Sequence, residues 1–441
     1  MVPRRRIGPV LAWALGLGPL VFLLGSGAHL EPPRGAVRPI DRFAAFVGAG
    51  SGLVGMALLA EAFVLSARVR WLEGVFGGLD GMYRTHHRLG VVAFGLLVLH
   101  PVALAFRFVP GEWGRAVAFV LPGHPRWAVD LGVYAGWGLI LLMVLTLTSW
   151  MSYDRWKLSH KALGLVLVAG AVHMWGVEDT RGRHVRMAAQ PGLWWYMTGL
   201  VGMGLVGAVY KTIVHPLWPT PRYTVSAVER RTDEVMEVTL RPQGAPLDAV
   251  PGQFVFVSVE GEGLSREAHP YTLCGPPDTD AVTVMVKALG DYTRRLYERL
   301  EPGMEATLDG PYGRFDYRDG GDRQIWIAGG VGVAPFLSWA RTLAHTGAAA
   351  PDVEFYYCVH DRSDAVYREE FEALGQQWSW MDVALVCSAE EGHLHARDLG
   401  DVTGADVFLC GPKRLTQDLR RQLRARGVPD ARIHFEDFEF R

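Results

Sequence analysis

Cysteine is scarce in this chain: among 441 residues only Cys274, Cys358, Cys387 and Cys410 occur, and no two of them form a C-x-x-C pair. This distribution argues against a zinc site and against a four-cysteine iron–sulfur cluster. Free, reduced thiols in a cytosolic compartment are favoured over disulfides. The chain also lacks an excess of positive or negative charge, since its net charge is −2. Nothing therefore indicates a nucleic-acid partner.

Hydrophobic residues are plentiful but unevenly placed. They make up 49% of the chain and concentrate in residues 1–215, whereas residues 221–441 have the composition of an ordinary soluble protein. Six apolar runs approach the roughly 20 residues needed to cross a bilayer, which predicts an all-α membrane bundle in contact with lipid. The runs are 7–28, 43–65, 88–109, 128–150, 160–178 and 193–214.

The first run and the loop charges bear on orientation. The run follows "RRR" (4–6) and ends in "GSGA" (25–28), so a cleaved signal peptide is the alternative to a retained helix. Its apolar length exceeds the roughly 7–15 residues of a signal-peptide core, which favours retention. Lys and Arg are only slightly more frequent on the flanks that lie inside when the N-terminus is inside. With six spans, both termini are then expected in the cytoplasm.

Two of the apolar runs carry histidines at matched positions. "THHRLGVVAFGLLVLHP" contains His86 and His100, and "SHKALGLVLVAGAVHMW" contains His160 and His173. The first pair spans about 21 Å of helix and lies about 40° short of four turns, so both rings can face one way. The second pair would lie about 140° apart on a straight helix, which requires a local distortion. Each level of the bundle then offers two imidazoles, one from each helix.

His87 is the rival to His86. Aligning "RLG" (88–90) with "ALG" (162–164) places His86, rather than His87, over His160, so His86 is preferred. A single buried histidine is more often a satisfied hydrogen-bonding group than a ligand, but ionisable residues within membrane spans usually have functional roles. Packing of the histidines in a bundle without haem stays open as the alternative.

The spacings H-x13-H and H-x12-H resemble those of the ferric reductase and NADPH oxidase transmembrane family. The resemblance implies two b-type haems, each held between two histidines at the two axial positions of its iron. It extends through the soluble half and covers most of the chain. The implied metal ligands are His86, His100, His160 and His173.

The soluble half starts after the Pro-rich "HPLWPTP" (215–221). Short alternating segments such as "YTVSAV", "QFVFVSV" and "AVTVMVKAL" predict an antiparallel β-barrel. "HPYTL" (269–273) and, about twenty residues later, "KALGDYT" (287–293) resemble the flavin-binding motifs of the ferredoxin–NADP reductase superfamily, and "GPYGRF" (310–315) closes its barrel. Gly290 is expected to permit a tight turn and Thr293 to cap a helix whose N-terminus binds the diphosphate of FAD. The implied FAD residues are His269, Pro270, Tyr271, Thr272, Lys287, Gly290, Tyr292 and Thr293.

A parallel sheet is predicted after the barrel. "RQIWIAGGVGVAPFLSWARTL" (323–343) reads as a strand, a Gly-rich turn and a helix, the unit that binds a nucleotide diphosphate. Further strands alternate with helical stretches, and "CGP" (410–412) ends one of them. By resemblance to the superfamily, Phe440 stacks on the flavin, with Phe438 as the alternative, and Cys410 lies beside the nicotinamide; these two are the implied catalytic residues. The implied NADPH or NADH residues are Gly329, Gly330, Gly332, Pro335, Cys410, Gly411, Pro412 and Phe440.

Three domains are therefore expected: a six-span domain over 1–215, an FAD barrel over 221–318 and a nucleotide-binding domain over 322–441. The resemblance implies electron transfer from cytosolic NAD(P)H through FAD and two haems to an acceptor beyond the membrane. Oxygen, giving superoxide, is the first choice. A ferric chelate, a periplasmic protein acceptor and a haem-free, membrane-anchored flavoreductase are the alternatives. Arg362 is a candidate partner for the 2′-phosphate of NADPH, and the choice between NADPH and NADH stays open.

Overall fold

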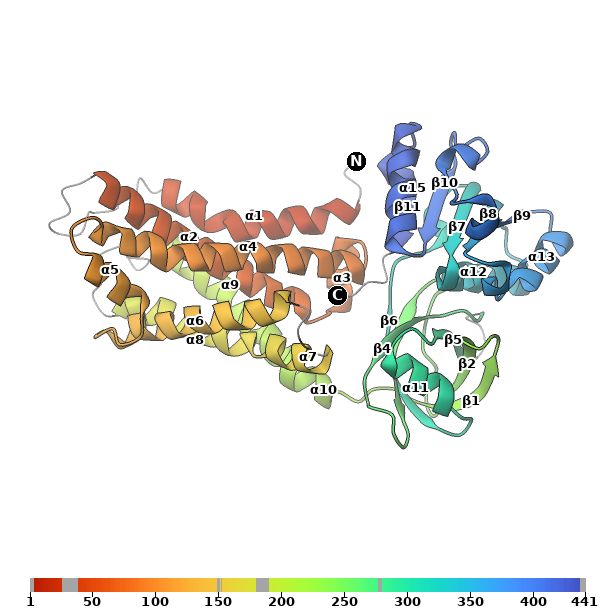
Figure 1. The fold of residues 1–441 in the computed structure, drawn as a ribbon, viewed down its shortest axis with the longest axis horizontal. Coiled ribbons are helices and arrows are strands. Elements are labelled where there is room, and N and C mark those ends of the chain that lie inside the picture. The colour runs from red at the N-terminus through yellow and green to blue at the C-terminus, as the bar shows by residue number, and fades with distance from the viewer. Residues whose placement is uncertain are drawn as a thin grey trace. The chain divides into compact units, whose positions relative to one another are not determined.

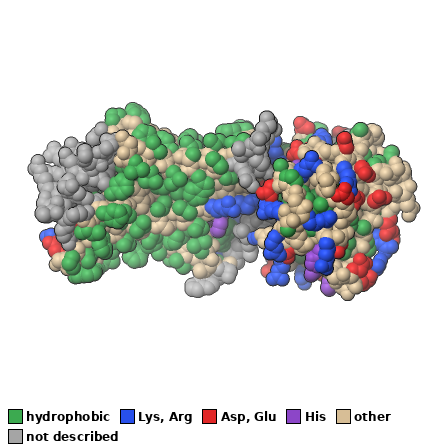
Figure 2. All heavy atoms as spheres, turned by 90° about the horizontal axis from the view of Figure 1, so that it is seen from above, with side chains coloured by type: hydrophobic (Ala, Val, Ile, Leu, Met, Phe, Trp, Pro, Cys, Tyr) green, Lys and Arg blue, Asp and Glu red, His purple; other side chains and the backbone are tan. Residues whose placement is uncertain are grey.

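In the computed structural model, residues 4–25, 39–148, 151, 153–179, 190–276 and 280–436 are described. The main division of the chain falls between Trp218 and Pro219. We call the part before it the helical unit and the part after it the sheet unit (Figure 1). Hydrophobic side chains dominate the visible face of the helical unit, and charged side chains gather on the sheet unit (Figure 2).

Six helices of the helical unit are long and apolar enough to cross a membrane, as the sequence predicts. The third span begins earlier than predicted, at Leu79 instead of residue 88, so that His86 lies within it. The protein is an integral membrane protein. The spans are Ile7–Gly25, Phe43–Ser66, Leu79–Phe108, Trp127–Leu147, Arg155–Val177 and Pro191–Leu217.

Helix α2 is the centre of this bundle. Its Ala57, Leu58 and Ala60 side chains are fully buried, and small residues let other helices come close. A Cβ at Gly204 would lie 2.8 Å from the Cα of Ala60, a close approach typical of membrane helix interfaces. The helices are α1 (Arg4–Gly25), α2 (Pro39–Ser66), α3 (Arg70–Phe76), α4 (Leu79–Ala105), α5 (Trp113–Val120), α6 (Trp127–Leu147), α7 (Tyr153–Lys161), α8 (Leu163–Asp179), α9 (Pro191–Val209) and α10 (His215–Leu217).

The fifth span is broken, which resolves the angular mismatch between its two histidines. Helix α7 ends at Lys161, Ala162 forms a turn, and α8 begins at Leu163. The N–H of Ala162 donates to the carbonyls of both Leu158 and Ser159. This tightened turn rotates α8 relative to α7, so the straight-helix angle no longer applies.

The first half of the sheet unit is the predicted antiparallel barrel. Its strand order is β4-β3-β6-β1-β2-β5, and a bridge between Leu273 and Val284 joins the two end strands. Alternating side chains of these strands fill the interior. The elements are β1 (Arg222–Arg230), β2 (Val235–Pro242), β3 (Phe254–Glu260), β4 (His269–Thr272), β5 (Val282–Lys287), β6 (Glu305–Tyr312) and α11 (Asp291–Arg299).

The second half is a five-stranded parallel sheet in the order β11-β10-β7-β8-β9. The central strand β7 is buried on both faces, as its unbroken apolar run predicts. Helix α15 covers the sheet with Leu419 and Leu423, which recur at a helical spacing of four. The elements are β7 (Arg323–Gly329), α12 (Ala334–Thr346), β8 (Asp352–Val359), α13 (Arg368–Gln377), β9 (Met381–Cys387), α14 (Ser388–Glu391), β10 (Asp406–Cys410), α15 (Lys413–Ala425) and β11 (Ile433–Glu436).

One aromatic core joins the barrel to the parallel sheet. Phe315 follows β6, and its ring centre lies 4.8 Å from that of Trp339 on α12. Trp339 in turn lies 5.1 Å from Trp326 on β7 and 5.3 Å from Phe408 on β10. Each of these large side chains is nearly or fully buried. Burial of this size stabilises the contact between the two halves by several kcal/mol.

An ion-pair cluster reinforces the same contact. The Arg341 guanidinium on α12 donates to Glu237 on β2 at 3.0 Å, to Glu370 on α13 at 2.7 Å and to the Cys274 carbonyl at 2.9 Å. The Tyr367 hydroxyl also donates to Glu237, at 2.9 Å. Burial alone raises the pKa of Glu237, but the Arg341 charge and these hydrogen bonds outweigh it and leave that pKa lowered.

We predict that Arg341→Met destabilises the sheet unit by about 3–5 kcal/mol, because Glu237 is then left buried without its main partner. Hydrogen-exchange mass spectrometry of the full-length protein in urea, on peptides of β2 and α12, measures this loss. Arg368→Met is the matched control, because Arg368 forms an exposed pair with Glu372 and exposed pairs contribute about 0–1 kcal/mol. Equal losses in both variants would contradict the prediction.

The stabilisation by the same cluster is expected to depend on pH in the acidic range. Since the pKa of Glu237 is lowered in the fold, its stabilisation is present above the ordinary glutamate pKa of about 4.3. It is lost as the pH falls through the lower folded value. The acid-side loss of protection should be smaller in Glu237→Gln than in the unmodified protein.

Candidate functional site

The four predicted histidines of the helical unit form two facing pairs. The ring centres of His86 (α4) and His160 (α7) are 6.0 Å apart, with 70° between the ring planes. Those of His100 (α4) and His173 (α8) are 6.2 Å apart, with 74° between the planes. His87, the rival to His86, has an exposed side chain. The chain therefore brings together the four residues that the sequence singles out.

Each imidazole is oriented through its Nδ1 atom. His86 Nδ1 donates to the carbonyl of Ala62 at 2.8 Å, and His100 Nδ1 to that of Gly48 at 2.7 Å, both on α2. His173 Nδ1 donates to the carbonyl of Ala128 on α6 at 2.7 Å. A carbonyl oxygen only accepts, so in these three rings Nδ1 carries the proton and Nε2 presents its lone pair.

His160 is held less tightly, by two other contacts. Its Nδ1 lies 3.4 Å from the Thr146 hydroxyl oxygen, whose own proton goes to the Leu142 carbonyl at 2.7 Å. The indole of Trp156 stacks on the ring with centres 5.3 Å apart and 13° between planes. Because the Thr146 proton is used, its oxygen is left to accept from Nδ1, which favours the same tautomer as in the other three rings.

The spacing of each pair suits one shared iron. Two imidazoles that bind one metal place their ring centres about 6 Å apart, since each metal–nitrogen bond is about 2 Å and each ring centre lies about 1 Å beyond its nitrogen. Metal-binding histidines commonly donate the other ring N–H to a carbonyl, as here. Among the described residues no group of three or more His, Cys, Asp or Glu side chains converges. Two protein ligands per level fit an iron whose remaining ligands come from a porphyrin.

Two glycines give the His100 and His173 rings their space. A Cβ at Gly52 on α2 would collide with His100 Nδ1, and one at Gly132 on α6 would collide with His173 Nδ1. Sequence reasoning missed both glycines and the three carbonyl acceptors. Every residue has a carbonyl, and glycine is frequent in membrane helices, so only the helix packing distinguishes them.

The predicted flavin motifs meet on one side of the barrel. His269, which begins β4, stacks on Tyr292 of α11 with ring centres 4.1 Å apart and 18° between planes. Strand β4 pairs with β3, so that Pro270 lies opposite Phe256 and Thr272 lies opposite Phe254. Two segments about twenty residues apart in sequence are thus brought into direct contact.

The hydroxyl group of Tyr271 is buried at this point without a hydrogen-bond partner among the described residues. Burial, followed by the neighbouring Tyr292, raises the pKa of Tyr271, so that its phenol stays neutral and can donate. Buried polar groups normally have hydrogen-bond partners. This orphaned hydroxyl, beside a stacked aromatic surface, fits a flavin and its ribityl chain.

At the start of α11 the predicted cap by the Thr293 side chain is present, but the predicted tight turn at Gly290 is not. Gly290 is the N-cap with φ −128° and ψ 179°, extended backbone that any residue adopts, so the expected tight turn is absent. Thr293 lies in the first turn, where its hydroxyl accepts from the N–H groups of Leu289 at 3.0 Å and Gly290 at 2.9 Å. The N–H groups of the first turn still point outward, as in an anion site. Lys287 is the last residue of β5, and its Nζ atom lies 3.7 Å from Glu234 Oε2.

The two predicted nucleotide loops lie at the reversal point of the parallel sheet. β7 pairs with β10 on one side and with β8 on the other. The chain therefore passes from β7 to β8 on one side and later returns from β9 to β10 on the other side. The crevice at the carboxyl ends of such strands is where open α/β sheets bind ligands. "GGVG" (329–332) follows β7 and "CGP" (410–412) ends β10 at this crevice.

Close backbone contact holds these loops together. A Cβ at Gly332 would collide with the Cys410 carbonyl, and one at Gly411 would lie 2.8 Å from the Gly329 Cα. Gly330 has φ +54° with open space around it, and Pro335 stands in the first turn of α12. A Cβ at Gly329 would meet Pro412 at 2.7 Å. Gly329, Gly332 and Gly411 thus let the two loops pack closely, and Gly330 leaves open space beside the backbone.

Three other predictions have different outcomes. Cys410 is fully buried, and all four cysteines are free. Phe440 and Phe438 lie outside the described residues. Arg362 is engaged, because its Nε and Nη2 atoms donate to the Glu390 carboxylate at 3.0–3.1 Å. Its charge is therefore already matched, so a 2′-phosphate would compete with a carboxylate there.

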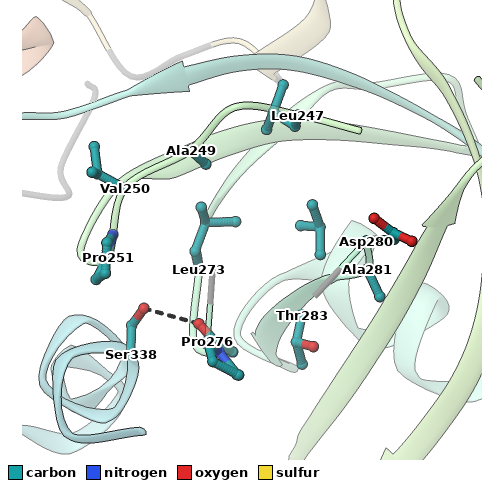
Figure 3. A pocket seen from close by; sticks show the side chains of 12 residues that line it. Leu247, Ala249, Val250, Pro251, Leu273, Pro276, Asp280, Ala281, Thr283 and Ser338 are labelled. Carbon is teal, nitrogen blue, oxygen red and sulfur yellow. Dashed lines mark hydrogen bonds between the residues drawn. The ribbon is translucent and has the colours of Figure 1, made fainter. Parts of the chain in front are cut away.

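A small cavity lies between the barrel and α12 (Figure 3). Its volume of about 20 Å³ has room for about one water molecule. The Ser338 hydroxyl beside it donates to the Gly275 carbonyl at 3.1 Å. Leu273, the last residue of the "HPYTL" motif, lines this cavity, but none of the predicted flavin or nucleotide residues does.

Comparison with known proteins divides the chain in the same order. Residues 51–171 match the family described as "Ferric reductase like transmembrane component". Residues 219–316 match the "FAD-binding domain", and residues 326–421 match the "Oxidoreductase NAD-binding domain".

Two curated relatives and one solved structure each resemble about half of the chain. It is 27% identical over 237 residues to "Propane 2-monooxygenase, reductase component" of Mycolicibacterium goodii, across 49% of this chain and 67% of that protein. It is 27% identical over 230 residues to "Carnitine monooxygenase reductase subunit" of Escherichia coli strain K12, across 48% and 67%. A crystal structure of the FAD/NAD-binding domain of nitric oxide dioxygenase from Vibrio cholerae has 27% identity, covers 50% of this chain and 98% of its own, and has a TM-score of 0.45.

We predict that Gly332→Ala raises the KM for NAD(P)H at least about tenfold, which is about 1.4 kcal/mol, because the added methyl group pushes the two loops apart. The flavin content should stay unchanged. Steady-state kinetics with an artificial dye as acceptor measure the KM. Gly244→Ala is the matched control, since its Cβ would meet no atom within 4 Å. An unchanged KM in Gly332→Ala would disprove the role of this contact.

Proposed function

Because this chain is an NAD(P)H-dependent flavin oxidoreductase that combines a ferric reductase-like transmembrane component with FAD-binding and NAD-binding domains, we propose that it carries electrons across the membrane. The route runs from cytosolic NAD(P)H through FAD and two b-type haems to an acceptor on the far side. The observation that carries this proposal is the two imidazole pairs, each about 6 Å across with Nε2 turned inward.

The residues divide the work in the order of the chain. Gly329, Gly330, Gly332 and the "CGP" segment (410–412) hold the nucleotide with their backbone, beside the flavin. The β4 and α11 residues hold FAD, with His269 and Tyr292 as an aromatic surface and Tyr271 as a donor. When bound, FAD accepts hydride and releases single electrons, and haem iron carries one electron at a time. The histidine pairs then hold the two irons at fixed positions.

The order of the two haem levels follows from chain connectivity. Ala62, which accepts from His86, and Phe63, which packs against Gly207 of α9, lie at the same end of α2. Helix α9 continues from there towards Pro219 and the sheet unit. The His86–His160 pair is therefore the entry level, and the sheet unit and both termini lie on the cytoplasmic side. About 21 Å of helix separates His86 from His100.

The His100–His173 pair is then the exit level. A haem iron held by both histidines of a pair would have no site left for the acceptor, so the acceptor would receive its electron without binding to the metal. Oxygen, giving superoxide, is our first proposal for the acceptor. A ferric chelate is the second proposal for the acceptor, favoured by the match to a ferric reductase component. It is also favoured by the positively charged Arg107, which lies over the rings of Phe108 and Phe119 at the same end of the bundle.

We predict that His86→Ala loses haem from the entry level, because one axial ligand is removed, whereas His87→Ala keeps it. Absorbance of the purified proteins, expressed with ample haem, measures the Soret and α bands. His87 is a matched control one residue away, with its side chain exposed. Purified wild-type protein that shows only flavin absorbance would exclude the haem route and leave a membrane-anchored flavoreductase.

We predict that NAD(P)H-driven reduction of cytochrome c is abolished by superoxide dismutase, because superoxide is the reductant. In His173→Ala, acceptor reduction should fall at least about tenfold while flavin bleaching by NAD(P)H survives, since only the exit level is damaged. Activity that ignores dismutase but turns over ferric citrate would assign iron as the acceptor. Insensitivity to dismutase without ferric turnover would indicate a protein acceptor.

A further inference from the structure

Glu61 is a carboxylate buried inside a membrane span. It lies on α2 within the span Phe43–Ser66, and its side chain is only 6% exposed. Neither carboxylate oxygen has a hydrogen-bond partner among the described residues. An unpaired charge in such surroundings costs several kcal/mol, and ionisable groups retained inside spans usually bind or move ions or protons.

Among the described residues, no cation pairs with Glu61. Its Oε1 lies 3.4 Å from where a Cβ of Gly16 would stand, and the span Ile7–Gly25 has no titratable side chain. On α9 the only titratable residue is Tyr196, which interacts electrostatically with Glu61. The Tyr196 hydroxyl donates to the Leu15 carbonyl, so its proton is used elsewhere.

The other neighbours of α2 are the histidine-bearing helices. The residue after Glu61, Ala62, accepts the Nδ1 proton of His86, and near the other end of α2 Gly48 accepts that of His100. Helix α8 packs on α2 where Gly170 meets Met56; its described side chains carry no charge, and His173 donates to Ala128. Glu61 thus lies at the level of the His86–His160 pair but on the side of α2 that faces α1 and α9.

We propose that Glu61 is a proton-binding site coupled to the arrival of an electron at the His86–His160 level. The inference rests on the proposed function, since it requires an iron between these two histidines. When one electron reduces this iron from the ferric to the ferrous state, Glu61 takes up one proton from water on its carboxylate. When the electron leaves for the exit level, Glu61 releases the proton.

The physical reason is charge balance in a medium of low dielectric constant. An added electron repels a nearby carboxylate far more strongly in the membrane interior than in water. Proton uptake removes this repulsion, and the coupling is reciprocal: protonation of Glu61 makes the electron easier to accept by the same free energy. Glu61 lies five residues from the end of its span at Ser66, about 7.5 Å of helix, so the path to water is short.

The test is a redox titration of the haem absorbance of the full-length holoprotein at several pH values. For one proton per electron, a tenfold change in proton concentration shifts a midpoint potential by about 59 mV. We expect one haem of the wild type to show most of this dependence and Glu61→Gln to lose it. Glu61→Asp, which keeps the acid, should retain it. Glu112→Gln is the matched control, because Glu112 is a half-exposed acid of the same unit, paired with Arg115.

If the Glu61→Gln variant does not fold, a second measurement still tests the inference. The reduced-minus-oxidised infrared spectrum of the wild type should contain a carboxylic-acid C=O band, which Glu61→Asp should shift. Absence of the band, or a potential in Glu61→Gln with the wild-type pH dependence, overturns the inference but leaves the electron route intact. Wild-type protein without haem absorbance overturns the route and this inference together.

Discussion

The helical unit depends on hydrogen bonds from imidazole rings to helix carbonyls. The rings of His86 and His100 donate to α2, and that of His173 donates to α6. In a bilayer every polar group must find its partner within the protein, so these bonds fix both the tautomer and the direction of each ring. Because the acceptors belong to helices, the Nδ1 atoms of these three rings are engaged and their Nε2 atoms are left to bind another group.

The sheet unit solves a related problem with packing. The barrel and the parallel sheet share the aromatic core around Trp339, and Arg341 ties β2 to α12 and α13. This contact holds the two halves as one body. The Gly-rich loop after β7 and the "CGP" segment meet at the reversal point of the parallel strands, which is where open α/β sheets generally bind ligands. The glycines there matter because two backbones approach each other more closely than any side chain allows.

The electrostatics of the two units are handled in opposite ways. In the sheet unit the buried Glu237 is ionised and matched by Arg341, with a lowered pKa. In the described part of the helical unit, Glu61 is buried with no matching cation. A paired buried charge serves stability and position, whereas an unpaired one inside a membrane span points to proton binding. The contrast explains why Glu61, rather than the better connected Glu237, is the group proposed to respond to electron transfer.

Sequence alone was sufficient for the six spans, the barrel and the parallel sheet, because these follow from hydrophobic periodicity and from strand and turn signals along the chain, whereas the preference for His86 over His87 as a ligand stays a prediction. The pairing of Arg362 with Glu390 was decided only by the tertiary structure. So were the carbonyl acceptors, the space at Gly52 and Gly132 and the isolation of Glu61. Each of these depends on which helix or strand comes to lie beside another, and contacts between distant segments leave no periodic trace in the chain.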